Sequence, residues 1–147
     1  MREDRAVSTT LGYVLALGIS AILITGLITA GGNYVEEERD QVVRDQLSVI
    51  GQQVAANAER ADRLVRAADS SSSPTVRINQ SFSERVTGTT YRIRFADSPN
   101  TVVVESVDPE IEVRIRATTD TEFTESTAGG GPIQIRYDGS ELEVRDV

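Results

Sequence analysis

The hydrophobic positions of this chain change their period twice along the sequence, and each change marks a new element. The first pattern is a run of 22 residues without a charge, from Val7 to Ile28. A helix of that length covers about 33 Å, which is enough to cross the hydrocarbon core of a bilayer. The run therefore predicts a helix over residues 7–30 that lies in a membrane or in an equally dry environment.

The second pattern is that of an amphipathic helix over residues 31–69. Its apolar side chains recur every three or four positions, with charged and amide residues between them. They are Val43, Leu47, Ile50, Val54, Ala58, Ala61, Val65 and Ala68. Gly31-Gly32 is the one obvious hinge and no proline precedes Pro74, so one helix is expected from about Ser8 to Asp69. We expect its apolar stripe to pack on the chain's own sheet; a coiled-coil seam is the alternative.

The third pattern has a period of two and begins after a serine-rich linker at residues 70–75. Apolar and polar residues alternate over 76–78, 91–95, 113–115 and 133–137. This alternation is typical of strands with one buried and one wet face. Asp138-Gly139 then predicts a hairpin to a last strand over 142–144, because tight turns need the positive φ that glycine adopts freely. The predicted fold class is α+β, with a small antiparallel β-domain over residues 76–147.

Composition narrows the chemistry that the chain can perform. It has no Cys and no His, so thiolate sites, disulfides and imidazole proton transfer are absent. The net charge of -8 argues against nucleic acid as a partner. All 15 basic residues are Arg, and such a Lys-free, acidic surface suits concentrated salt, although GC-rich codon usage could also remove Lys. We expect a protein that is not an enzyme, binds no cofactor and comes from a halophile.

Two local motifs carry weaker chemical signals. Asp108, Glu110 and Glu112 offer three carboxylates to a hard cation, but they lack the glycine turn of a calcium loop, so a solvated strand edge is preferred. A hydrolase built on these carboxylates lacks an aromatic cleft. The aromatic side chains are expected in the core instead: Phe82, Tyr91, Phe95, Phe123 and Tyr137. Asn79 begins the sequon Asn-Gln-Ser and is a candidate for glycosylation. The loop 129–132 is glycine-rich but lacks the residues of a phosphate cradle.

The N-terminal residues resemble those of haloarchaeal type IV pilin-like proteins. In that family Arg-Ala or Arg-Gly precedes Val-Ser-Pro-Val-Ile-Gly and an apolar helix, and Arg5-Ala6-Val7-Ser8 and Gly12 occupy the matching places. Residues 9–11 depart from the pattern, which favours a minor or pilin-like subunit. The resemblance implies that residues 1–6 are a leader that a prepilin peptidase removes between Ala6 and Val7. It also implies that the helix waits in the membrane and later packs against its copies in a filament.

The charged residues that flank the apolar run and the small residues within it are also relevant to the pilin-like hypothesis. Arg2 and Arg5 precede the span and three glutamates follow it, which predicts a cytoplasmic head and an outer C-terminal domain. Small residues at four-residue spacings allow helices to approach closely; they are Ala16, Ser20, Gly26 and Ala30. The predicted function is a structural, adhesive filament subunit. The alternative function is a single-pass anchored binding domain that never polymerises. A secretory signal is disfavoured, because the apolar run is longer than the core of such a signal and continues directly into the amphipathic helix.

Overall fold

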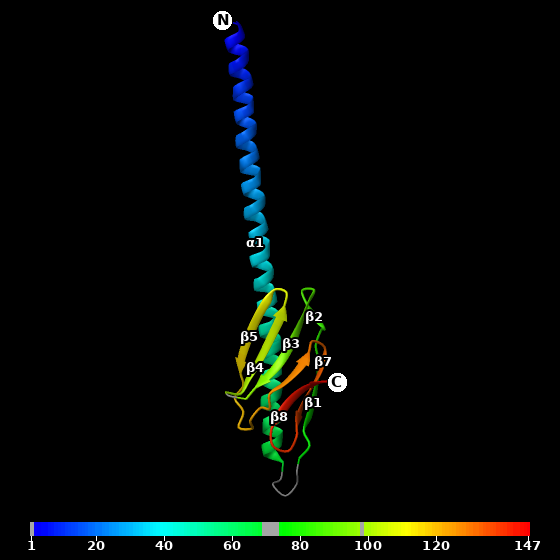
Figure 1. Ribbon diagram of the computed structural model, residues 1–147. Coiled ribbons are helices and arrows are strands. Elements are labelled where there is room, and N and C mark those ends of the chain that lie inside the picture. The colour runs from blue at the N-terminus through cyan, green and yellow to red at the C-terminus, as the bar shows by residue number, and fades with distance from the viewer. Residues whose placement is uncertain (1, 69–73, 98) are drawn as a thin grey trace. The chain divides into compact units, whose positions relative to one another are not determined.

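The computed structural model describes residues 2–68, 74–97 and 99–147 (Figure 1). The chain divides into two compact units, Met1–Arg39 and Asp40–Val147. Helix α1 covers Arg2–Ala67, and strands follow in the second unit. The strands of the described part are β1 (Arg77–Ser81), β2 (Arg85–Val86), β3 (Thr89–Ala96), β4 (Thr101–Val107), β5 (Glu110–Arg116), β6 (Ser126–Gly129), β7 (Pro132–Tyr137) and β8 (Leu142–Asp146). The α+β fold class predicted from the sequence is confirmed.

Helix α1 begins earlier than predicted. It starts at Arg2 and not near Ser8, so residues 2–6, the predicted leader, are also helical. No glycine or proline precedes Gly12, and the carboxylates of Glu3 and Asp4 suit a helix N-terminus. The helix also continues through Gly31-Gly32 without a break. Its predicted end at Asp69 and most of the predicted linker, residues 70–73, lie outside the described residues.

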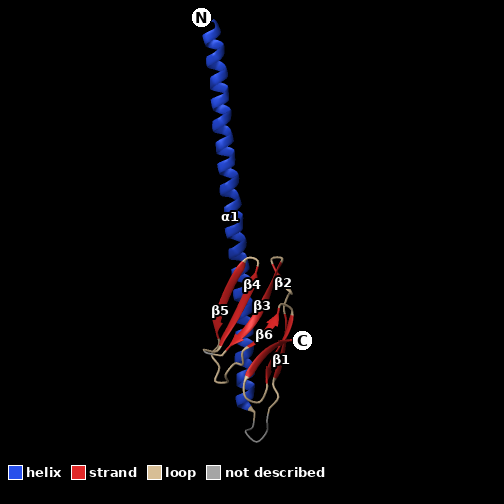
Figure 2. Cartoon of the chain, viewed as in Figure 1, coloured by secondary structure: helices blue, strands red, loops and turns tan. Residues whose placement is uncertain are grey.

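The strands form two antiparallel sheets on one side of the C-terminal part of α1 (Figure 2). One sheet has the order β1-β7-β8, and the other has the order β2-β3-β4-β5, with β6 also paired to β3, along residues 92–95. The predicted hairpin between the last two strands is confirmed by the register Tyr137↔Leu142. Its loop has four residues, in which Gly139 has φ 114 and Asp138 accepts hydrogen bonds from the backbone N–H groups of Ser140 and Glu141.

The apolar stripe of α1 packs on the chain's own β-domain, as predicted. Val43, Leu47, Val54, Ala58 and Ala61 are fully buried in one core together with side chains from both sheets. The apolar stripe is therefore buried by the chain's own strands and is not available to form a coiled coil. Most of the exposed residues of this helical segment are charged or amide residues, with Val42, Val49 and Leu64 as apolar exceptions, which is the division of faces expected of an amphipathic helix.

Gly51 lies where the helix comes closest to the sheet. A Cβ at this position would lie 2.9 Å from Cγ1 of Ile115 on β5 and 3.3 Å from Cγ2 of Val104 on β4. Glycine lowers helix propensity, so its place in a helix interior needs a reason. The close approach of the helix backbone to two strands supplies that reason, and the sequence pattern alone did not reveal it.

The strand predictions were correct where alternation was clear and incomplete elsewhere. Strands β3, β5, β7 and β8 include the predicted segments, and β1 begins one residue later than predicted, at Arg77. Strand β4 and the short strands β2 and β6 were not predicted. The glycine-rich loop predicted over 129–132 is shorter, Gly130-Gly131, because Gly129 belongs to β6 and Pro132 to β7. Among the predicted core aromatics, Tyr91, Phe95 and Phe123 are buried, with the last two stacked at a centroid distance of 4.3 Å. Phe82 and Tyr137 are half-buried.

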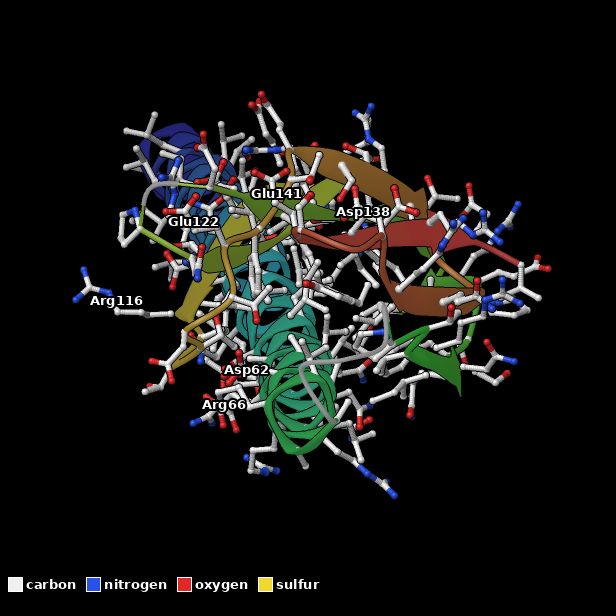
Figure 3. The ribbon with its side chains drawn as sticks, turned by 90° about the horizontal axis from the view of Figure 1, so that it is seen from below. Asp62, Arg66, Arg116, Glu122, Asp138 and Glu141 are labelled. Atoms are coloured by element: carbon white, nitrogen blue, oxygen red, sulfur yellow. The ribbon has the colours of Figure 1, made fainter. Side chains whose placement is uncertain are left out.

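Two acids on α1 hold the connection between β5 and β6 against the helix. Asp62 is 1% exposed, and one of its oxygens accepts hydrogen bonds from the backbone N and the hydroxyl of Thr121 at 2.9 and 2.8 Å. Its other oxygen pairs with Nε of Arg66 at 3.0 Å (Figure 3). One turn earlier, Glu59 accepts a hydrogen bond from the backbone N of Thr118 at 3.0 Å. Helix and connection are thus joined by polar contacts as well as by the core.

Asp62 makes the stability of this contact depend on pH. Burial by itself would raise the pKa of Asp62, but the hydrogen bonds from Thr121 and the charge of Arg66 together hold the pKa below its ordinary value. The ionised form is therefore favoured in the folded state. Its contribution is fully present above the pKa of an unfolded Asp, about 3.9, and is lost as the pH falls through the lower folded pKa.

We expect Asp62→Asn to be less stable than the natural protein at pH 7, because an amide nitrogen would face Arg66 or Thr121. The difference should begin to shrink as the pH falls below about 3.9, the pKa of an unfolded Asp, and should be smallest below the lower folded pKa of Asp62. Urea unfolding at several pH values measures both quantities. Asp40→Asn is the matched control, since Asp40 is exposed on the same helix. A difference that stays constant across this range would refute the assignment to Asp62.

Candidate functional site

The first unit consists of helix alone, and its side chains are exposed and apolar on every side. The charge-free run continues past Ile28 to Val35. Its large apolar side chains are between 53% and 73% exposed: Leu11, Tyr13, Val14, Leu15, Leu17, Ile19, Ile22, Leu23, Ile24, Leu27, Ile28, Tyr34 and Val35. A helix that is hydrophobic all round belongs in a bilayer or inside an assembly. In the part of the chain that the structure describes, this is the one helix long and apolar enough to cross a membrane.

Three hydroxyl groups in the described part of this run form hydrogen bonds within the helix. Ser20 Oγ donates to the carbonyl oxygen of Ala16 at 2.8 Å, and Thr25 Oγ1 donates to that of Ala21 at 2.8 Å. Thr29 Oγ1 donates to the carbonyl oxygen of Thr25 at 3.0 Å. A polar group without a partner is costly in hydrocarbon, so these internal bonds make the segment compatible with a dry environment.

The four small residues predicted to pack helices lie on one side of α1. At about 100° per residue, Ala16, Ser20, Gly26 and Ala30 fall within an arc of about 120°. Ile19, Leu23 and Leu27 fall within the same arc, so this side of the helix carries both small and large side chains. A Cβ at Gly26 would meet nothing within 4 Å in the chain itself. Any steric demand for glycine at this position must therefore come from outside this chain.

The predicted cleavage point lies within the same helix. The Ala6–Val7 bond is part of α1, which starts at Arg2. The backbone of this region is described, but the side chains of residues 2–9 are not. Cleavage after Ala6 therefore stays a prediction. A peptidase that acts there would have to unwind at least the turn of helix around this bond, because proteases bind extended chain.

The candidate glycosylation site lies on the outer face of the three-stranded sheet. Asn79 is exposed on β1, an edge strand, and its Oδ1 accepts a hydrogen bond from Nε2 of Gln134 on β7 at 2.8 Å. The neighbouring Gln80 points inward and accepts a hydrogen bond from Asn57 on the helix at 3.0 Å. The sequon is thus folded into a sheet with its Asn exposed, and its modification stays a prediction.

The carboxylates considered for a cation are not gathered into a site. Asp108 lies in the turn before β5, while Glu110 and Glu112 lie on that strand. Within residues 2–68, 74–97 and 99–147, no three side chains of the His, Cys, Asp and Glu types are close enough to hold a metal ion. Glu112 instead pairs with Arg114, and β5 is the last strand of its sheet. The arrangement agrees with the preferred interpretation of a solvated strand edge.

The β-domain also has an open groove of about 490 Å³ between helix residues 45–53 and the segment from Ser81 to Val86. Its floor is apolar, with Val49, Ile50 and Phe82, and the charged residues on its rim are Asp45 and Arg85. Asp45 accepts a hydrogen bond from Gln41 at 2.9 Å, one turn earlier on the helix. Among the described residues, Asp45 is the one carboxylate that lines the groove, and it already accepts a hydrogen bond. Hydrolysis needs an acid and a base that act together.

Comparison with known proteins gives one finding. The model of a family of unknown function, DUF7266, matches residues 2–145, which is nearly the whole chain. No curated protein matches, and no solved structure matches. The match covers helix and β-domain together, so the two form the unit that the family shares.

Proposed function

This chain belongs to the family of unknown function DUF7266, and from its architecture we propose that it is a structural subunit of an archaeal type IV pilus-like surface filament. In this proposal the N-terminal helix holds the subunit in the membrane before assembly and packs against its copies afterwards. The role is mechanical and adhesive. The N-terminal resemblance around Arg5-Ala6-Val7-Ser8 favours a minor or pilin-like subunit of a haloarchaeon.

One observation carries the proposal: a single helix serves two different purposes along its length. Residues 10–35 expose apolar side chains in every direction, whereas Val43 to Ala61 is built into the core of the β-domain. A plain membrane anchor does not need to contribute part of its own helix to the core of the domain that it holds. A filament subunit benefits from this arrangement, because load on its packed helix must pass to the domain that forms the surface.

The alternative is a single-pass anchored domain that does not polymerise, and the apolar run alone suits it equally well. The two functions differ in where the protein is found. Shearing native cells should release the filament subunit into a high-molecular-weight fraction, whereas an anchored domain stays with the membrane. Absence of the natural protein from the sheared fraction would favour the anchored domain.

A second expected result concerns the leader. Arg5-Ala6 lies directly before the apolar run, where a prepilin peptidase at the cytoplasmic face can reach it. Mass spectrometry of the membrane-extracted protein should therefore find Val7 as the first residue. An Arg5→Ala variant should keep its full N-terminus, since the basic residue belongs to the recognition pattern of the family. An intact Met1 to Ala6 in a native host with an active peptidase would contradict the prediction.

A further inference from the structure

The outer face of the β1-β7-β8 sheet is basic on a protein whose net charge is -8. Its outward positions carry three arginines, Arg77, Arg136 and Arg145, and one acid, Glu143, with amides and small residues between them. The basic sheet face is our name for these three arginines together with Asn79 and Gln134. It is a concentration of positive charge where the composition of the chain would predict the opposite.

Within the described residues, Arg77 and Arg145 form no ion pair, and Arg136 has a single one, with Glu143. Arg77 lies directly opposite Arg136 in the register of β1 and β7, and like charges in that arrangement destabilise a sheet. Glu143 is 3.8 Å from Nη1 of Arg136, a long contact, and Nε of Arg136 is buried with no hydrogen-bond partner in the described residues. Such a group needs an explanation in a folded protein.

A row of hydrogen bonds holds the third arginine in position. Arg145 Nε donates to Oε1 of Gln134 at 3.1 Å, and Gln134 Nε2 donates to Oδ1 of Asn79 at 2.8 Å. This row holds the exposed guanidinium by its Nε, and no hydrogen bond or ion pair is formed by its two terminal nitrogens within the described residues. A guanidinium fixed in this way is ready to bind a carboxylate through two parallel hydrogen bonds.

The same chain carries a complementary segment. Glu36, Glu37, Glu38 and Asp40 follow the apolar run within little more than one turn of α1, and Arg39 is the one cation among them. All five side chains are exposed, and none forms an ion pair within the part of the chain that the structure describes. Glu36 and Asp40 are one turn apart, where like charges destabilise a helix.

We propose that the basic sheet face of one subunit binds the acidic segment 36–40 of a second copy of this chain. Within the described residues, Arg77 and Arg145 on one surface and residues 36–40 on the other form no ion pair, and the two surfaces have opposite net charge. Because the two surfaces are different, the contact is head-to-tail, and repetition of such a contact produces an open chain of subunits. This inference rests on the proposed filament function and names the contact that would link successive β-domains to the helices of their neighbours.

The experiment uses full-length protein in native cells and compares the sheared filament fraction with the membrane fraction. Arg77→Glu with Arg145→Glu is the first variant, and Arg63→Glu with Arg116→Glu is its control. The control arginines are exposed and outside any ion pair in the described residues, and Arg116 extends into solvent (Figure 3). We expect the first variant to lose about tenfold or more from the sheared fraction at an unchanged membrane level, and the control to lose little.

The second arm neutralises the other surface with Glu36→Gln, Glu37→Gln and Asp40→Asn, which adds no positive charge beside the membrane span and so preserves its orientation. It should show the same loss. Normal filaments from either variant, or an equal loss in the control, would overturn the proposed contact. A loss in the arginine variant alone would show that the basic sheet face binds something other than segment 36–40. Absence of the natural protein from the sheared fraction would instead refute the filament function itself.

Discussion

Replacing Leu47 by alanine is expected to lower the free energy of unfolding of the β-domain by about 2 to 5 kcal/mol. Leu47 is fully buried between the helix and both sheets, and it is among the largest side chains of the core. Its truncation would remove apolar contacts and leave a cavity that the surrounding strands cannot fill. Urea unfolding of a fragment that contains residues 36–147, followed by circular dichroism, measures the loss.

The helix provides a chemically matched control for this prediction. Leu64 is the same residue type on the same helix, but it is 48% exposed. Leu64→Ala should therefore change the stability by no more than about 0.5 to 1 kcal/mol, and a change at the exposed Arg44 should also have a small effect. Equal losses at Leu47 and Leu64 would mean that the packing face of the helix has been assigned incorrectly.

Replacing Gly26 by leucine should separate membrane insertion from filament assembly. The variant stays apolar, so its insertion should be normal and the membrane fraction should hold the usual amount of protein. Within the chain there is room for the new side chain, because nothing lies within 4 Å of a Cβ at this position. If the helices of a filament approach closely at Gly26, the leucine should block that approach and remove the protein from the sheared fraction.

The alanine variant at the same position tests whether size is the cause. Gly26→Ala also removes the glycine and raises helix propensity, but it adds only one methyl group. It should keep most of the protein in the sheared fraction, so that the loss follows the volume of the side chain. Normal assembly of the leucine variant would count against close packing at Gly26, whereas equal failure of both variants would indicate an effect on the helix itself.

The sequence pattern predicted those elements whose two faces differ strongly in polarity. The stripe from Val43 to Ala68 and the alternation in β3 and β7 are of this kind, and the structure has them in the predicted places. Strand β4 was missed because Val102, Val103 and Val104 are all fully buried, which hides the period of two. Val103 faces away from the main core, between Arg94 and Arg114 in the register, and the stems of such arginines can cover apolar surface.

The pattern of hydrophobic and polar positions did not reveal contacts between residues that are far apart in the sequence. Asp62 looks like an ordinary polar position of an amphipathic helix, yet it is buried because Thr121, 59 residues later, brings donors to it. Asn100 similarly accepts from the backbone N of Phe123 at 3.1 Å and donates to the carbonyl oxygen of Thr121 at 2.9 Å. The basic sheet face also depends on strand order, since β1 and β7 are far apart in sequence.

The construction of the core from both helix and strands limits where the β-domain can be cut away from the apolar run. The compact unit begins at Asp40, and the helix residues from Val43 to Ala61 form one wall of its interior. A protease that cut within this wall would expose the apolar side of the strands, and the remaining fragment would unfold and be degraded. Any stable fragment that contains the β-domain should therefore begin at or before Asp40.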